Sequence, residues 1–100
     1  MGMGSLTLHI HARGGEVRTL VVGNGDHTIG RASTNAIPID DGILGRHHCI
    51  LRVTNDRVTV EDTDSASGTY LDGNLTRGPT DVNEGSTISI GSTRIQIVRS

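Results

Sequence analysis

ILGRHHCIL, the stretch from Ile43 to Leu51, begins with a loop pattern and ends with a strand pattern. Gly45 permits a backbone angle that a side chain would penalise, so we expect the chain to bend there. Arg46 follows at once and brings a guanidinium with five hydrogen-bond donors to the bend. Polarity then alternates from residue to residue, which predicts a β-strand over His48–Thr54. One face of this strand carries Cys49, Leu51 and Val53, and the other carries His48, Ile50 and Arg52.

A second glycine-arginine pair, Gly30 and Arg31, lies earlier in the chain at the end of the strand-like run His27–Ile29. The planar arginine fork donates two parallel hydrogen bonds to one phosphate or carboxylate and keeps a constant charge. Two loop arginines framed by β structure therefore predict an anion-binding site. For Arg46 an alternative stays open, in which its side chain braces the loop by bonding carbonyl oxygens or a neighbouring carboxylate, Asp40 or Asp41.

The composition is that of one small domain with an aliphatic core. The chain has 100 residues, 33% of them hydrophobic, and Tyr70 is its one aromatic residue. We predict one domain over residues 6–98, preceded by a tail or expression remnant at residues 1–5. The core must be built from Val, Ile, Leu and Ala, and each buried Val, Ile or Leu contributes about 1.5–3 kcal/mol before entropy is subtracted.

Charge, hydropathy and cysteine content argue against several classes of protein. The net charge is −2, whereas a nucleic-acid-binding surface is normally basic, so we expect no nucleic-acid partner. No apolar run approaches ~18 residues, so we expect no membrane span. Cys49 is the one cysteine, and it therefore has no partner for an internal disulfide. This favours an intracellular location, most simply the cytoplasm.

Short strand-like segments separated by turn residues predict an all-β fold. Asn55-Asp56 and Asp72-Gly73 are typical of two-residue hairpin turns, and Pro38 places its short strand at a sheet edge. Many short strands at regular spacing predict a sandwich or barrel. We expect strands at Leu6–Ala12, Val17–Val22, His27–Ile29, Ala36–Ile39, His48–Thr54, Val58–Val60, Thr69–Leu71, Thr87–Ile90 and Arg94–Ile97. We expect turns or loops at Gly23–Asp26, Ala32–Asn35, Asp40–Gly45, Glu61–Gly68 and Leu75–Pro79.

The order and spacing of these features, from about Leu6 to Ile97, resemble the forkhead-associated (FHA) domain family, whose members bind phosphothreonine peptides. The matching landmarks are Gly30-Arg31, Gly45-Arg46-His47-His48, Asp62 with Ser65-Ala66-Ser67-Gly68-Thr69, Asp72-Gly73, and Gly85 with Ile88-Ser89-Ile90-Gly91. The resemblance implies a two-sheet β-sandwich of roughly ten or eleven strands. Peptide-binding loops would lie at one rim, and the termini would lie together at the other end.

The same resemblance implies a non-catalytic signalling module whose partner is a phosphothreonine-bearing protein. Arg31 corresponds to the phosphate-contacting arginine of the family, and His48 to a histidine that braces the loops from within. The residues expected to bind the phosphopeptide are Arg31, Ser33, Thr34, Gly45, Arg46, Ser67 and Gly68. The residues expected to support the site are Gly30 and Gly68, which let the backbone turn, together with His48 and Thr69.

Three positions depart from the family pattern, and at one of them, Ala66, the family often has a polar residue that contacts the peptide. The family usually has serine, which contacts the phosphate, where this chain has Gly45, and asparagine, which holds the peptide backbone, where this chain has Ser67. Losing two such contacts costs ~3–6 kcal/mol, or two to four decades in affinity. Arg46, Ser33, Thr34, the Ser67 hydroxyl and the unhindered Gly45 amide are candidates to compensate. The alternative function is therefore a degenerate FHA-like domain that binds a partner without phosphate.

Other candidate sites carry a weaker signal. His9 and His11 point the same way on one strand and form a possible metal pair, but the sequence places no third ligand, so two exposed polar positions are the better interpretation. Cys49 lies in the core stripe, where a thiol is inert. Asp62 and Asp64 are expected to cap their loop through local bonds to the backbone. We expect no catalytic centre, no metal and no cofactor, and the sequence leaves the oligomeric state open.

Overall fold

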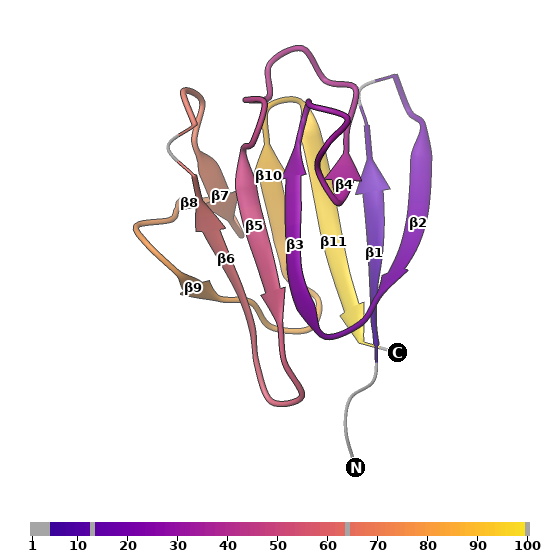
Figure 1. Ribbon diagram of the computed structural model, residues 1–100, viewed down its shortest axis with the longest axis vertical. Helices are drawn as coiled ribbons and strands as arrows, with labels where there is room; N and C mark the ends of the chain where they lie inside the picture. Colours follow the sequence, from indigo (N-terminus) through magenta and orange to yellow (C-terminus); the bar gives the residue numbers. More distant parts are fainter. Residues whose placement is uncertain (1–4, 13, 64, 100) are drawn as a thin grey trace.

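Two β-sheets pack face to face in the computed structural model of the protein, which describes residues 5–12, 14–63 and 65–99 (Figure 1). One sheet has six strands in the order β2-β1-β11-β10-β7-β8, and the other has five in the order β4-β3-β5-β6-β9. Neighbouring strands run antiparallel, apart from the parallel pair β3 and β4. No described residue lies in a helix. The predicted all-β, two-sheet sandwich of ten or eleven strands is confirmed.

The strands are short, and tight turns connect several of them. Their bounds are β1 Leu6–His11, β2 Val17–Val22, β3 Gly25–Gly30, β4 Ile37–Pro38, β5 Cys49–Val53, β6 Val58–Asp62, β7 Thr69–Leu71, β8 Asn74–Leu75, β9 Thr80–Asp81, β10 Thr87–Ile90 and β11 Thr93–Arg99. The predicted turn at Asp72-Gly73 joins β7 to β8, and both residues have positive φ, 50° and 86°. The strand that contains Pro38 lies at a sheet edge, as expected for a residue without an N–H.

Alternating burial along the strands builds the core. In β1 and β5 every second side chain is buried between the sheets, beginning with Leu6 and Cys49. The C-terminal strands β10 and β11 add Ile88, Ile90 and further isoleucines. The buried hydrophobic residues are Leu6, Leu8, Ile10, Ile29, Ile37, Ile39, Leu44, Cys49, Leu51, Val53, Val58, Val60, Val82, Ile88, Ile90, Ile95 and Ile97. All are aliphatic apart from the single cysteine, so the core has the predicted composition.

Some element bounds differ from those expected from the sequence. β3 begins at Gly25, inside the predicted turn, and β6 extends to Asp62, inside the predicted loop. The two-residue strand β8 includes Leu75, the first residue of the stretch expected to be irregular, and the two-residue strand β9 follows that stretch, where no strand was expected. In each case backbone pairing with a neighbouring strand sets the bounds, such as Gly25 opposite Val53 and Asp62 opposite Cys49. Residues that are typical of turns occupy these positions, so the sequence does not indicate that they pair in a sheet.

Three loops lie together at one end of the sandwich (Figure 1). They are the β3–β4 loop (residues 31–36), the β4–β5 loop (residues 39–48) and the described part of the β6–β7 loop (residues 63 and 65–68). We call this end the loop rim. The opposite end holds the start of β1 and the end of β11, where Leu6 pairs with Arg99. The expected arrangement, with the loops at one rim and the termini at the other end, is therefore observed.

The predicted tail at residues 1–5 lies outside the described residues except for Ser5. In the described part of the chain no helix is long and apolar enough to cross a membrane.

Candidate functional site

Backbone hydrogen bonds join the first two loops of the loop rim. The amide of Arg31 donates to the carbonyl of Gly45 at 2.9 Å, and the amide of Ala32 donates to the carbonyl of Arg46 at 3.1 Å. A third backbone bond lies next to these two, in which the amide of His48 donates to the carbonyl of Ile29 at 2.8 Å. The β3–β4 and β4–β5 loops therefore prolong the β3–β5 pairing, and this fixes where Arg31 and Arg46 leave the backbone.

Asn35 is a buried connection between the same two loops, although the sequence indicated only a loop at this position. Its Nδ2 donates to the carbonyl of Ala32 at 2.8 Å and to that of Arg46 at 2.6 Å. Its Oδ1 lies 2.9 Å from Nδ1 of His47. An asparagine among small residues is typical of an exposed turn, so nothing in the sequence distinguished this buried role.

His48 connects the β4–β5 loop to the β6–β7 loop from a fully buried position. Its Nδ1 accepts a hydrogen bond of 3.1 Å from the amide of Gly45, and its Nε2 lies 2.8 Å from the carbonyl of Gly68. Because an amide can only donate, Nδ1 carries the lone pair, and Nε2 carries the proton that it donates to Gly68. A single neutral tautomer of His48 thus makes both hydrogen bonds, one to each loop.

Asp62 organises the β6–β7 loop. Its carboxylate accepts bonds from the amide of Ser65 at 2.8 Å, the hydroxyl of Ser65 at 2.6 Å and the hydroxyl of Thr69 at 2.7 Å. Burial of Asp62 opposes its ionisation, but the hydrogen bonds from Ser65 and Thr69 outweigh burial and lower its pKa. Asp62 therefore has the loop-capping role expected from the sequence, while Asp64 lies outside the described residues.

Replacing Asp62 with alanine is expected to lower the free energy of unfolding by about 2–4 kcal/mol at pH 7, because three hydrogen bonds to a charged group are lost. Since folding lowers the pKa of Asp62, its contribution is complete above the unfolded value of about 3.9 and disappears as the pH falls through the folded value. Urea unfolding at pH 7 and in acid measures this. Asp56→Ala, in an exposed hairpin turn, is the control. Equal losses in the two variants at pH 7 would contradict the assignment.

Two arginine side chains are exposed on the loop rim. Arg31 donates from Nε to the carbonyl of Leu44 at 3.3 Å, which orients the guanidinium and leaves its two terminal nitrogens available. Arg46 is exposed, and among the described residues its side chain has no hydrogen bond or ion pair. The alternative in which Arg46 braces the loop is therefore wrong for the side chain. Its backbone carbonyl braces the loop instead, by accepting from Ala32 and Asn35.

Ser33, Thr34 and Ser67 are also exposed on the loop rim. Within the described ranges none of these three hydroxyls has a protein hydrogen-bond partner. Gly45 and Gly68 differ, because their amides are occupied by Nδ1 of His48 and by the Ser65 hydroxyl respectively. The expectation that the Gly45 amide compensates for the missing serine is therefore wrong, and neither glycine amide is free to bind a ligand.

The glycines in and beside the loop rim differ in whether the structure requires glycine. Gly68 has a φ of 86°, which agrees with the expected turn. Gly30 and Gly45 do not have positive φ, so the predicted special bends at these residues are wrong. Gly30 is buried in β3, where a Cβ would collide with the carbonyl of Arg46 and lie 2.9 Å from the amide nitrogen of His48. At Gly45 the nearest atom to such a Cβ is 3.8 Å away.

Three further side chains with metal-binding or nucleophilic chemistry are those of His9, His11 and Cys49. The described residues hold no group of three or more His, Cys, Asp or Glu side chains placed to bind a metal ion. Nδ1 of His9 lies 3.3 Å from the hydroxyl of Thr19 on the neighbouring strand. Burial, and then the charge of Asp62, raises the pKa of the Cys49 thiol to about 12. The thiolate that a nucleophile requires is therefore scarce near neutral pH.

The family model of the FHA domain matches residues 27–91, which is more than half of the chain and includes all three loops of the rim. The chain belongs to the FHA domain family. No curated protein matches it. The family assignment agrees with the resemblance seen in the sequence.

Solved FHA domains share the fold of this chain over nearly its whole length. The FHA domain of CT664 from Chlamydia trachomatis superposes with a TM-score of 0.90 at 18% identity, covering 97% of this chain and 99% of that one. A domain from an analysis of phosphothreonine-dependent FHA domain interactions has a TM-score of 0.85 at 23% identity, with 96% and 97% coverage. Mycobacterium tuberculosis EmbR, in complex with a low affinity phosphopeptide, has a TM-score of 0.86 at 25% identity, covering 97% of this chain and 25% of EmbR.

Proposed function

We propose that this FHA domain is a non-catalytic interaction module that binds a phosphothreonine-bearing protein at the loop rim, inside the cell. The observation that carries the proposal is the Arg31 side chain, which is exposed on the rim and oriented by its bond to the Leu44 carbonyl. In the described structure the three ion pairs of the protein do not include it. Two terminal nitrogens thus remain for a phosphoryl group, whose oxygens match the arginine fork.

The exposed side chains around Arg31 supply further donors of the kind that a phosphopeptide needs. Arg46 adds a second positive charge, and Ser33 and Thr34 add hydroxyls from the β3–β4 loop. Ser67 faces the solvent on the β6–β7 loop, and its hydroxyl supports the proposal as a group that bonds the peptide backbone. Beside that loop an open hollow of about 640 Å³ is lined in part by Tyr70, Leu75 and other exposed residues. It offers room for a side chain of the same peptide.

Relatives of known structure support this choice of ligand. One similar FHA domain comes from work on phosphothreonine-dependent interactions, and EmbR was solved with a phosphopeptide. The test is calorimetric titration of the purified chain with a library of phosphothreonine peptides and their unphosphorylated counterparts. We expect measurable affinity only for phosphorylated members of the library. Binding that does not distinguish the two forms would overturn the proposal.

A second candidate function is binding to a partner protein without phosphate. It is favoured by Gly45, which has no side chain to reach a phosphate and whose amide is occupied by His48. Ala66, exposed on the neighbouring β6–β7 loop, adds no polar group. Phosphatase treatment of the partner separates the two functions, because a phosphate-independent complex survives it and a phosphothreonine-dependent complex dissociates.

Restoring the two side chains that are usual in the family, with Gly45→Ser and Ser67→Asn together, is expected to raise phosphopeptide affinity about 10- to 100-fold. The serine side chain fits without strain, because Gly45 has no positive φ and its Cβ position is open. Titration of the double variant against the same peptides measures the gain. Gly42→Ser is a matched control in the same loop, since Gly42 is exposed and its Cβ position is also open. An unchanged affinity in the double variant would show that these positions do not face the phosphopeptide.

A further inference from the structure

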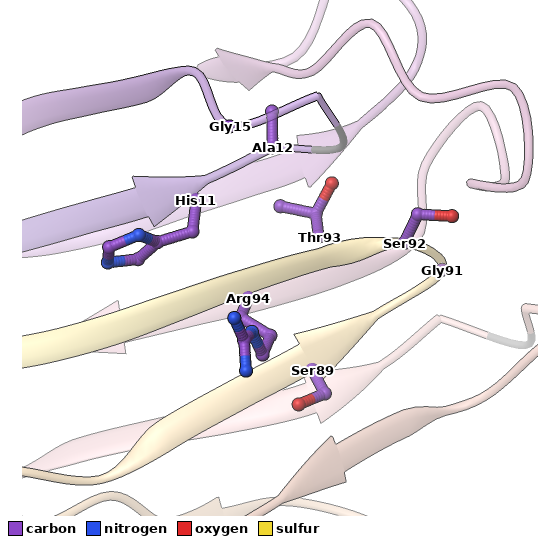
Figure 2. A pocket seen from close by; sticks show the side chains of 8 residues that line it. All are labelled: His11, Ala12, Gly15, Ser89, Gly91, Ser92, Thr93 and Arg94. Carbon is purple, nitrogen blue, oxygen red and sulfur yellow. The ribbon is translucent and has the colours of Figure 1, made fainter.

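A cationic hollow lies on the outer face of the six-stranded sheet, outside the site described above. His11 of β1, Arg94 of β11 and Ser89 of β10 are direct neighbours across three strands, because Arg94 is opposite both His11 and Ser89. These three side chains line an open hollow of about 550 Å³ (Figure 2). Its other lining residues belong to the β1–β2 and β10–β11 turns or flank them: Ala12, Gly15, Gly91, Ser92 and Thr93. We call this the outer hollow.

Among the described residues that line it, the outer hollow holds a positively charged arginine, a histidine and hydroxyl groups but no carboxylate. Adjacent residues along the same faces of β1, β10 and β11 are also uncharged or basic: Thr7, His9, Thr87, Gln96 and Val98. In the described structure the side chains of His11, Arg94 and Ser89 have no protein hydrogen-bond partner. Placing a histidine directly opposite an arginine costs stability when both are charged. The net charge of the chain is −2, yet Arg94 forms no ion pair among the described residues and lies opposite His11.

The outer hollow is joined to the loop rim by a rigid connection through Asp41. The buried carboxylate of Asp41 accepts bonds from the amide of Ser92 at 2.8 Å and the hydroxyl of Thr93 at 2.9 Å. It also accepts from the amide of Ile43 at 3.0 Å, which fixes the β4–β5 loop against the β10–β11 turn. The side chain of Ile43 is 51% exposed at this junction. It offers an apolar contact to any chain that crosses from Arg31 to Arg94.

We propose that the outer hollow binds a second phosphoryl group, carried by the same phosphoprotein that occupies the loop rim. This inference rests on the proposed function of the rim. Arg94 supplies a fork of donors, His11 an imidazole N–H and Ser89 a hydroxyl, which together suit a phosphate ester. The bound segment runs over Ile43, so that the two phosphoryl groups lie on either side of the β4–β5 loop. The module then favours doubly phosphorylated partners over singly phosphorylated ones.

The test compares phosphothreonine peptides with and without a phosphoserine at each position roughly three to ten residues to either side, which samples spans of about 10–33 Å for an extended chain at about 3.3 Å per residue. We expect the best doubly phosphorylated peptide to bind about 3- to 10-fold more tightly than its singly phosphorylated parent. The advantage should vanish in Arg94→Gln and shrink in His11→Gln, while affinity for the parent stays unchanged. Arg99→Gln removes the same charge from the far end of β11 and should keep the advantage.

Two readouts separate this inference from the proposed function. Side-chain NMR signals of His11 and Arg94 should shift with the doubly phosphorylated peptide and stay in place with its parent. A glutamate in place of the phosphoserine should give less of the gain, because a carboxylate has fewer acceptor oxygens and less charge. Arg31-dependent binding of the parent without any second-phosphate advantage, or an advantage that survives Arg94→Gln, overturns this inference alone. No binding by any phosphopeptide overturns both.

Discussion

Replacing Arg31 with alanine is expected to weaken binding of a phosphothreonine peptide by at least about 100-fold. The guanidinium donates to the Leu44 carbonyl through Nε, which leaves its two terminal nitrogens to bond two phosphoryl oxygens. Hydrogen bonds between charged groups contribute about 1.5–3 kcal/mol each, so two of them account for a change of this size. The fold should be unaffected, because the Arg31 side chain is exposed and its loop is held by backbone bonds to Gly45.

Calorimetric titration of wild type and variants with one phosphothreonine peptide measures this effect. Arg31→Lys keeps the charge but loses the planar fork, so its affinity should fall between those of wild type and Arg31→Ala. Arg57→Ala is the control, since Arg57 is an exposed arginine outside the loop rim and its ion pair with Asp81 contributes little to stability. A peptide that binds Arg31→Ala as well as it binds wild type would show that the phosphate lies elsewhere.

Much of this fold could be predicted because its strands follow one simple rule. Leu6, Leu8 and Ile10 alternate with polar residues, and the structure buries this face between the sheets. The two-residue strands β8 and β9 could not be predicted, because segments so short carry no periodicity and exist only through pairing with neighbours. Tertiary context overrides local preference at such positions.

The loop rim was predictable in its outline but not in its connections. Arg31 and His48 stand in recognisable motifs, and the structure places one exposed on the rim and the other buried beneath it. No feature of the sequence indicates that Asn35 bonds two carbonyls and a histidine, because two of those partners, Arg46 and His47, belong to another loop. The hydrogen bond from the Gly45 amide to Nδ1 of His48 could not be predicted either, because it depends on the conformation of the loop between them.

Alanine at Gly30 is expected to lower the free energy of unfolding by about 3 kcal/mol or more, whereas alanine at Gly45 should change it by less than about 1 kcal/mol. In the sequence the two residues carry the same signal, since each precedes an arginine at a predicted bend. The structure separates them, because neither has positive φ and only Gly30 has backbone atoms against its Cβ position. Those atoms belong to Arg46 and His48, so they cannot move without opening the pairing that holds the loop rim together.

Thermal unfolding of the two variants measures this contrast directly. For a domain of this size 1 kcal/mol corresponds to a shift in Tm of about 4–8 °C, so Gly30→Ala should unfold at least about 10 °C below wild type. Gly45→Ala is the matched control, because it introduces the same methyl group at the other glycine that precedes a rim arginine and removes the same backbone freedom from the unfolded chain. If the two variants unfold at the same temperature, close approach of the β4–β5 loop to β3 is not what requires glycine at position 30. If Gly30→Ala alone is destabilised, the loop that presents Arg46 depends on a contact that no other residue type permits.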